Sequence, residues 1–247
     1  MLKLLSYPLT IIYYLCFGLT LLIFHPIQWI CFNVFGYEAH KKSVDILQFF
    51  LMRCLNVLGT RFTFINPHHI AENTPLIVVS NHQSMYDISP LSWYLRKYHP
   101  KFISKVELGK GIPSVSYNLR HGGAALIDRK NPRQSLPTLI KFGDYIEQKK
   151  YAAVIFPEGT RSENGTPKPF QTKGLEILLR KIPSAYVIPI SINNSWKTLR
   201  YGKFPMGLGT HITFTVHKPL KVSTFTNNEE LINSIETKIK EHITIKP

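Results

Sequence analysis

A run of residues without a charged side chain lies close to the N-terminus and extends over Leu4–Phe24. As a helix it would be roughly 30 Å long, which is enough to cross the hydrocarbon core of a bilayer. Lys3 supplies only a weak positive start, and no small-residue cleavage site follows Phe24, so the run does not match a signal peptide. We therefore expect a helix embedded in a membrane.

The residues after this run predict how the helix is arranged. His25–Pro26 follows it, and proline removes a backbone donor and discourages straight continuation. A second apolar segment, Ile27–Phe35, is too short to cross a bilayer alone. One spanning helix, a helical hairpin that bends at His25–Pro26 and dips into one leaflet, and a hairpin buried in a soluble protein are the three arrangements to consider. Positive charge at both outer ends, on Lys3 and on Lys41–Lys42, favours the membrane hairpin with both ends cytoplasmic.

Beyond this region, short β-rich runs alternate with helical stretches. Ser43–Gly59 has apolar residues at helical spacing and is expected to end at Gly59. The expected strands are Arg61–Ile65, Leu76–Ser80, Lys101–Ser104, Ala124–Ile127, Ala152–Phe156, Tyr186–Ile192 and His211–Val216. The expected helices are Ser84–Lys97, Gln134–Lys149, Thr172–Lys181 and Asn228–Ile243. The alternation predicts an α/β fold whose largely parallel or mixed sheet is covered by helices on both faces. We predict two domains, membrane-anchoring helices over 1–59 and an α/β domain over 60–247.

Charge and cysteine content narrow the possible partners. The chain has 30 Lys and Arg against 15 Asp and Glu, a formal charge of +15, which suits an anionic membrane surface, an acidic carrier protein or nucleic acid. The basic residues are scattered and do not alternate with aromatic ones, so we do not expect nucleic-acid binding. Cysteines end at Cys54, which excludes a disulfide within the α/β domain and fits a reducing cytoplasm. No Cys-x-x-Cys or His/Cys cluster is present, and no metal site is predicted.

The segment Asn81–Asp87 directly follows a buried strand and contains a candidate catalytic pair. On a regular helix His82 and Asp87 would point about 140° apart, so they meet only if His82 lies in the turn before the helix. An imidazole oriented by a carboxylate is a general base, and here it would deprotonate a hydroxyl of the substrate because no GxSxG elbow accompanies it. Ser84-x-x-Asp87 is also a helix-capping pattern, so Asp87 could instead serve only as a cap.

Three further segments place cations at the ends of predicted strands. Arg161 lies in Phe156–Ser162, where a glycine permits close backbone approach and the guanidinium offers a planar fork for phosphate. Arg129 ends Gly123–Arg129, and Lys105 begins Lys105–Leu108. Arg161 could instead lie exposed in a turn, and Arg129 could form a surface ion pair with its neighbour Asp128. Together they predict an anion site at one edge of the sheet.

These motifs resemble those of the 1-acylglycerol-3-phosphate acyltransferase family, which is part of the glycerolipid acyltransferase superfamily. The segments that carry the resemblance are Asn81–Asp87 for the His-x4-Asp motif, Gly123–Arg129 for the second block, Phe156–Ser162 for the third, Ile188–Ile190 for the fourth and Lys105–Leu108 for a further recurring stretch. Leu126 replaces the usual Phe of the second block. The resemblance covers roughly residues 60–220, with the motifs in the family's order. It implies that residues 60–247 form a glycerolipid acyltransferase domain.

The resemblance implies transfer of a fatty acyl chain from acyl-CoA or acyl carrier protein to the sn-2 hydroxyl of lysophosphatidic acid, without a metal or organic cofactor. His82 would be the base, and Asp87 would hold its tautomer. The residues that would bind the acceptor phosphate are Arg129, Arg161 and Lys105. The residues that would shape the acceptor pocket are Glu158, Gly159 and Thr160. Backbone amides near His82 are candidate donors to the oxyanion.

The family also has a two-helix membrane anchor, in agreement with the hairpin, and the implied location is a bacterial-type cytoplasmic membrane with the catalytic domain on the cytoplasmic side. An acyltransferase of the same superfamily with another acceptor is the alternative. That acceptor would be glycerol-3-phosphate, lyso-ornithine lipid or another lysophospholipid. The motifs are less specific for the acceptor than for the superfamily.

Overall fold

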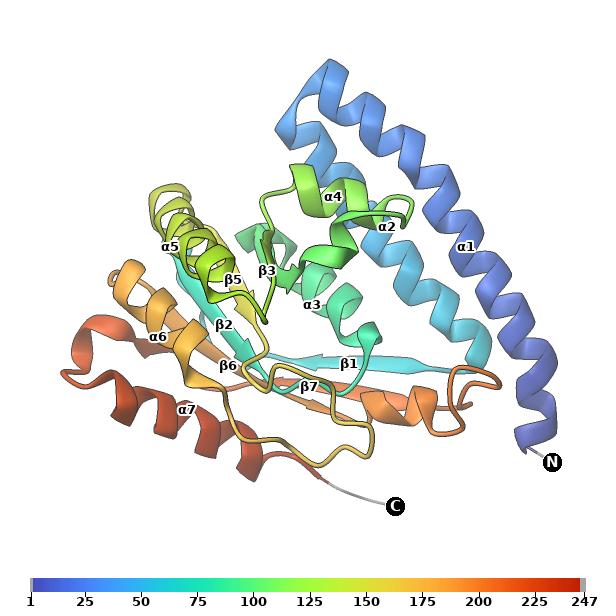
Figure 1. Ribbon diagram of the computed structural model, residues 1–247. Helices are drawn as coiled ribbons and strands as arrows, with labels where there is room; N and C mark the ends of the chain where they lie inside the picture. Colours follow the sequence, from blue (N-terminus) through green and yellow to red (C-terminus); the bar gives the residue numbers. More distant parts are fainter. Residues whose placement is uncertain (1, 245–247) are drawn as a thin grey trace.

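The computed structural model describes residues 2–244 and has a mixed, mostly parallel sheet with helices on both faces (Figure 1). The strands are β1 (Arg61–Ile65), β2 (Leu76–Ser80), β3 (Pro100–Lys105), β4 (Ala125–Ile127), β5 (Ala152–Ile155), β6 (Tyr186–Asn193), β7 (His211–Val216) and β8 (Leu220–Lys221). The α-helices are α1 (Leu2–Phe35), α2 (Tyr37–Cys54), α3 (Ile88–Tyr94), α4 (Val115–His121), α5 (Pro132–Lys149), α6 (Thr172–Lys181) and α7 (Asn228–Glu241). The predicted α/β class is confirmed.

The sheet order is β1-β7-β6-β2-β5-β3-β4, and β8 pairs with β6. β2 is parallel to β5 and β6, whereas β7 and β8 run antiparallel to β6. Every residue of β2 is buried, since its odd-numbered residues face the core under α5, α6 and α7 and its even-numbered residues face the core beside α3. The carboxyl end of this central strand therefore has a fixed position, and the candidate motif follows it.

The N-terminal helices form a hairpin, but its turn is not at the predicted place. Helix α1 continues through Pro26 to Phe35, and the chain reverses at Gly36, whose φ of 81° is in the left-handed region that favours glycine. Packing outweighs the loss of one helical hydrogen bond at Pro26. Leu21 packs against α2, and its carbonyl accepts a hydrogen bond of 2.6 Å from the hydroxyl of Ser114.

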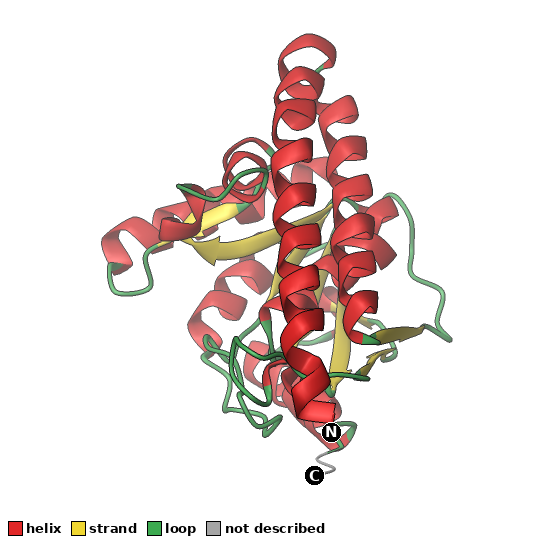
Figure 2. Cartoon of the chain, turned by 90° about the vertical axis from the view of Figure 1, so that its right-hand side faces the viewer, coloured by secondary structure: helices red, strands yellow, loops and turns green. Residues whose placement is uncertain are grey.

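Figures 1 and 2 show α1 and α2 side by side along one flank of the molecule. Within residues 2–244, α1 is the one helix long and apolar enough to cross a membrane. Much of its surface is apolar and uncovered, with Leu15, Leu22 and Ile23 more than half exposed. It is also attached to the α/β domain, because Thr10 Oγ1 accepts a hydrogen bond of 2.9 Å from the Met206 amide.

Most other boundaries are within two residues of those expected. The helical segment over 43–59 begins earlier, at Tyr37, and ends in a 3-10 turn at Gly59, as predicted. The helix predicted over Ser84–Lys97 is wrong as one element, because it consists of a 3-10 turn over Met85–Asp87, α3 and a second 3-10 turn over Arg96–Tyr98. Helix α4 and strand β8 were not predicted.

Candidate active site

The turn after β2 is fixed by side-chain bonds to the neighbouring strand. The Asn81 amide donates to the Ile192 carbonyl at 2.9 Å, and its oxygen accepts from the Ile192 amide at 2.7 Å. This pair joins the carboxyl end of β2 to β6 much as a backbone ladder would. His82 is the next residue, so its position is set by the sheet and not by a free loop.

His82 and Asp87 are in contact, with 2.8 Å between Nδ1 of His82 and Oδ2 of Asp87. Asp87 is fully buried, and the same oxygen accepts hydrogen bonds from the amides of Gln83 and Ser84 at 2.8 and 2.9 Å. The Ser84–Asp87 capping box is present as well. The two interpretations of Asp87 are thus compatible, since one carboxylate caps the turn and orients the imidazole.

The remaining contacts of His82 hold its ring at the cavity wall. The ring stacks on Phe156, with centroids 4.2 Å apart and planes 18° apart. The backbone carbonyl of His82 accepts a hydrogen bond of 2.8 Å from the Ser162 amide. Because Nδ1 faces Asp87, Nε2 is the ring nitrogen without a partner among the described residues. An imidazole held in this way can accept a proton on Nε2.

Glu158 supports this arrangement from behind and does not line the cavity. Its carboxylate accepts hydrogen bonds from the amides of His82 and Lys168, each at 3.1 Å, and the side chain is 2% exposed. Burial raises the pKa of this carboxyl, and the two amides partly offset the effect. Glu158 therefore joins the His82 turn to the loop after β5, a position different from the pocket-shaping one that the family resemblance implied.

Ser84 does not have the geometry of a nucleophile. Its hydroxyl is fully buried, lies 2.6 Å from the hydroxyl of Ser195, and accepts a hydrogen bond from the Tyr86 amide at 3.0 Å. Its bonding capacity is used in the cap and in the contact with the segment after β6. Ser84 is therefore not available as a nucleophile for His82 in this structure.

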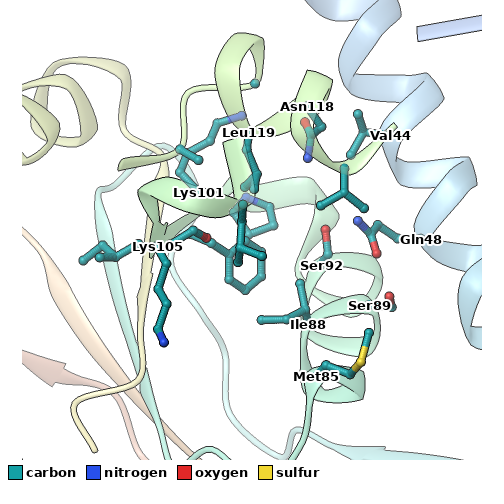
Figure 3. A pocket seen from close by; sticks show the side chains of 18 of the residues that line it. Val44, Gln48, Met85, Ile88, Ser89, Ser92, Lys101, Lys105, Asn118 and Leu119 are labelled. Carbon is teal, nitrogen blue, oxygen red and sulfur yellow. The ribbon is translucent and has the colours of Figure 1, made fainter. Parts of the chain in front are cut away.

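A cavity of about 760 Å³ opens in front of His82, between β3 and helices α2, α3 and α4 (Figure 3). Its volume is in the range of small-ligand sites. The sequence-predicted residues that line it, besides His82, are Lys105, Arg129, Gly159, Thr160 and Arg161. The structure therefore brings the three predicted cations and the histidine to one cavity.

The cations differ in their surroundings. The side chains of Lys105, Arg129 and Arg161 are all exposed, but partial desolvation of the Arg129 guanidinium lowers its pKa despite the nearby Glu107. Among the described residues Arg129 forms no salt bridge with Asp128, so the surface ion pair considered from the sequence is absent. Guanidinium groups without a carboxylate partner are available for a phosphate.

Lys168 also lines the cavity, and none of the sequence motifs indicated it. Its ammonium donates to the Thr160 hydroxyl at 2.9 Å and to the Arg161 carbonyl at 2.7 Å. Its backbone amide binds Glu158, so Lys168 holds the loop that carries Arg161. It lies outside the matched motif segments, and only the folded loop brings it back to them.

The expected oxyanion donors are engaged elsewhere. The amide of His82 donates to Glu158, and the amides of Gln83 and Ser84 donate to Asp87. These three groups serve to position His82, so the expectation that they bind an oxyanion is not met in this structure.

Comparisons with known proteins identify the family of this chain. A family model described as Acyltransferase matches residues 61–193, just over half of the chain. The chain belongs to the acyltransferase family. This acyltransferase resembles a chloroplastic 1-acyl-sn-glycerol-3-phosphate acyltransferase of Brassica napus, with 32% identity over 61% of this chain and 42% of the relative. It also resembles the 1-acyl-sn-glycerol-3-phosphate acyltransferase of Helicobacter pylori, with 36% identity over 48% of this chain and 51% of the relative.

The matches with curated relatives span about half the length of those relatives. A solved structure extends the fold comparison to nearly the whole acyltransferase chain. The crystal structure of the 1-acyl-sn-glycerophosphate acyltransferase PlsC from Thermotoga maritima matches 98% of this chain and 95% of its own, with a TM-score of 0.77 and 23% identity. The N-terminal hairpin and the α/β domain therefore share one known fold.

Proposed function

We propose that this acyltransferase moves a fatty acyl chain from acyl-CoA or acyl carrier protein to the sn-2 hydroxyl of 1-acylglycerol-3-phosphate, forming phosphatidic acid for phospholipid synthesis. The observation that carries the proposal is the oriented His82, whose free Nε2 lies at a cavity that three cations also line. The names of the curated relatives support this choice of acceptor.

In the proposed reaction Nε2 of His82 takes the proton of the acceptor hydroxyl as its oxygen attacks the thioester carbonyl. The C–O bond forms, the C–S bond breaks, and the proton passes from His82 to the departing thiolate. Asp87 stabilises the imidazolium through the 2.8 Å contact with Nδ1. The thioester supplies the activation, so the proposal invokes no metal or cofactor.

We assign the acceptor phosphate to Arg129, Arg161 and Lys105. Each charge-assisted hydrogen bond to a phosphate contributes about 1.5–3 kcal/mol, so two or three of them would hold the acceptor with its hydroxyl near His82. Gly159 and Thr160 line the same wall, and the Gly159 φ of 73° lets the backbone approach closely.

We further propose that residues 1–59 anchor the acyltransferase in a cytoplasmic membrane, with the active site on the cytoplasmic side. The exposed apolar face of α1 supports this assignment. Lys41 and Lys42 lie beside the turn at Gly36 and not at an outer end of the hairpin, so the charge argument made from the sequence does not apply to this hairpin. The charge of +15 favours an anionic lipid surface and is compatible with an acidic carrier protein as donor.

An acceptor panel tests the proposal. Purified protein in detergent is given one radiolabelled acyl-CoA with lysophosphatidic acid, glycerol-3-phosphate, lysophosphatidylcholine or lyso-ornithine lipid. The proposal predicts that lysophosphatidic acid gives the highest kcat/KM. A higher kcat/KM for another acceptor would move the protein to a sister activity in the same superfamily.

A further inference from the structure

One end of the cavity has a polar wall. Four of its lining residues, which we term the end cluster, are Tyr37, His40, His99 and Lys101. The Lys101 ammonium donates to the Tyr37 hydroxyl at 2.8 Å, and that hydroxyl lies 3.0 Å from Nδ1 of His99. An apolar chain enclosed in the cavity would gain nothing from these groups.

Lys101 is a buried cation without a carboxylate partner. It is 6% exposed, and the Tyr37 hydroxyl is its one hydrogen-bond partner among the described residues. Asp45, which also lines the cavity, is paired with Lys41 at 2.6 Å. Burial and the charge of Lys41 lower the pKa of Lys101 to about 8. The ammonium also lies 4.9 and 5.3 Å from the ring centroids of Tyr37 and Tyr151, which are weak partners. An ammonium has three N–H groups, so two of them have no nitrogen or oxygen acceptor among the described residues.

His40, whose charge interacts with that of Lys101, adds unused hydrogen-bonding capacity. It is 1% exposed, and neither of its ring nitrogens has a partner among the described residues. The side-chain oxygen of Gln48 lines the same cavity two turns, roughly 12 Å, further along α2, and it too is buried without a donor within residues 2–244. Buried polar groups without partners are costly, and their occurrence together beside one cavity indicates a ligand group that binds there.

Strand register places the end cluster far from the reacting group. Lys101 pairs with Ala153 of β5, which pairs with Ile77 of β2, five residues before His82. At about 3.3 Å per residue, the five positions from Ile77 to His82 correspond to roughly 16 Å along the strand direction. An extended palmitoyl chain spans roughly 19 Å, at about 1.25 Å per C–C bond. In Figure 3 the side chain of Lys105 extends toward the lower part of the view, where Met85 lies, whereas Lys101 lies in the upper part, close to Leu119.

We propose that the end cluster is a subsite for an oxygen atom, in a hydroxyl or carboxylate group, at the distal end of the donor's acyl chain. The inference rests on the proposed acyl transfer. Because the cations Lys105, Arg129 and Arg161 are assigned to the acceptor phosphate, the interior of the cavity is left for the donor chain. Lys101 then donates to the distal oxygen, and the enzyme selects oxygenated acyl donors.

The test compares three donors with lysophosphatidic acid as acceptor: palmitoyl-CoA, ω-hydroxypalmitoyl-CoA and the ω-carboxyl analogue. The full chain in detergent is expected to use at least one oxygenated donor with a kcat/KM at least about tenfold above that of palmitoyl-CoA, since a hydrogen bond to a charged group discriminates by this much. Preference for the carboxyl over the hydroxyl analogue identifies an ion pair, and the reverse identifies a neutral hydrogen bond.

The quantity compared is the kcat/KM of an oxygenated donor divided by that of palmitoyl-CoA. Lys101→Met is expected to bring this ratio close to one, while the matched surface variant Lys149→Met is expected to keep the wild-type value. A wild-type ratio of one or less for both oxygenated donors, or an unchanged ratio in Lys101→Met, would overturn the subsite and leave the proposed function in place. The wild-type ratio needs no variant, so it decides the matter even if Lys101→Met does not fold. Absence of transfer from every donor would overturn the proposed function, and the subsite with it.

Discussion

Asp87→Asn separates the two tasks of this carboxylate. Oδ2 of Asp87 accepts three hydrogen bonds, from His82 Nδ1 and from the amides of Gln83 and Ser84, and Oδ1 is buried without a partner. An asparagine oxygen placed at Oδ2 accepts from all three donors as before, and its NH₂ then occupies the site of Oδ1. The opposite orientation would point NH₂ at three donors. The variant therefore keeps the turn geometry and loses the negative charge.

The size of each effect follows from these contacts. A buried NH₂ without an acceptor costs about 1–3 kcal/mol, so the free energy of unfolding falls by that amount. The imidazolium formed during proton transfer loses its counter-charge 2.8 Å away, and the hydrogen bond becomes a neutral one of about half the strength. Since oriented general-base catalysis contributes about 10²–10⁴ in rate, we expect kcat to fall by at least about 100-fold.

The assay is single-turnover acyl transfer, combined with thermal unfolding of the same preparations. Ser84→Ala is the matched control, because it removes the other half of the capping box, costs about 1 kcal/mol of stability and leaves the charge near His82 in place. Asp87→Asn should be far slower than Ser84→Ala at similar stability. If Asp87→Asn retained most of its activity, Asp87 would be a cap alone, and the role assigned to it here would be wrong.

Three further changes have defined outcomes. Arg161→Lys should raise the KM for lysophosphatidic acid by about tenfold because the bidentate fork is lost, and an unchanged KM would contradict the phosphate assignment. Glu158→Gln should lower kcat by up to about 100-fold and destabilise the fold by about 1–3 kcal/mol, since one of two buried amides loses its acceptor; surface Glu230→Gln should do neither. Lys101→Met should raise the free energy of unfolding below pH 8 by about 1–3 kcal/mol, because burial lowers the folded-state pKa of Lys101 from 10.5 to about 8 and disfavours the protonated form, while loss of the hydrogen bond to Tyr37 and of the contacts with the Tyr37 and Tyr151 rings offsets part of the gain. As pH rises from 8 to 10.5 the folded wild type loses that proton first, so the gain should shrink; equal stabilities of both proteins at pH 7 would contradict it.

The parts of the fold that the sequence predicts well are those with a strong local pattern. β2 has five consecutive apolar or small residues, and its bounds and burial are as expected. The position of His82 just beyond it follows from that boundary alone. His82 lies in the turn before the 3-10 turn over Met85–Asp87, and Ser84 is extended, so Asp87 reaches His82 as the spacing of the two residues requires.

The errors come from contacts between distant segments. Pro26 is a local signal for a break, but packing on α2 and the bond from Ser114 keep α1 continuous, and the positive φ of Gly36 sets the turn instead. Neither Lys101 nor Lys168 was identified as a functional residue from the sequence. Only the fold buries the first beside Tyr37 and returns the second to the loop of Arg161.

The most direct test of the account is acyl transfer from palmitoyl-CoA to lysophosphatidic acid by purified wild type and His82→Ala in detergent, with thermal unfolding of both. If His82 is the general base, wild type forms phosphatidic acid, and His82→Ala is slower by at least about 100-fold with its fold intact. Equal rates would remove His82 from the mechanism, and absence of phosphatidic acid from wild type would contradict the assigned reaction.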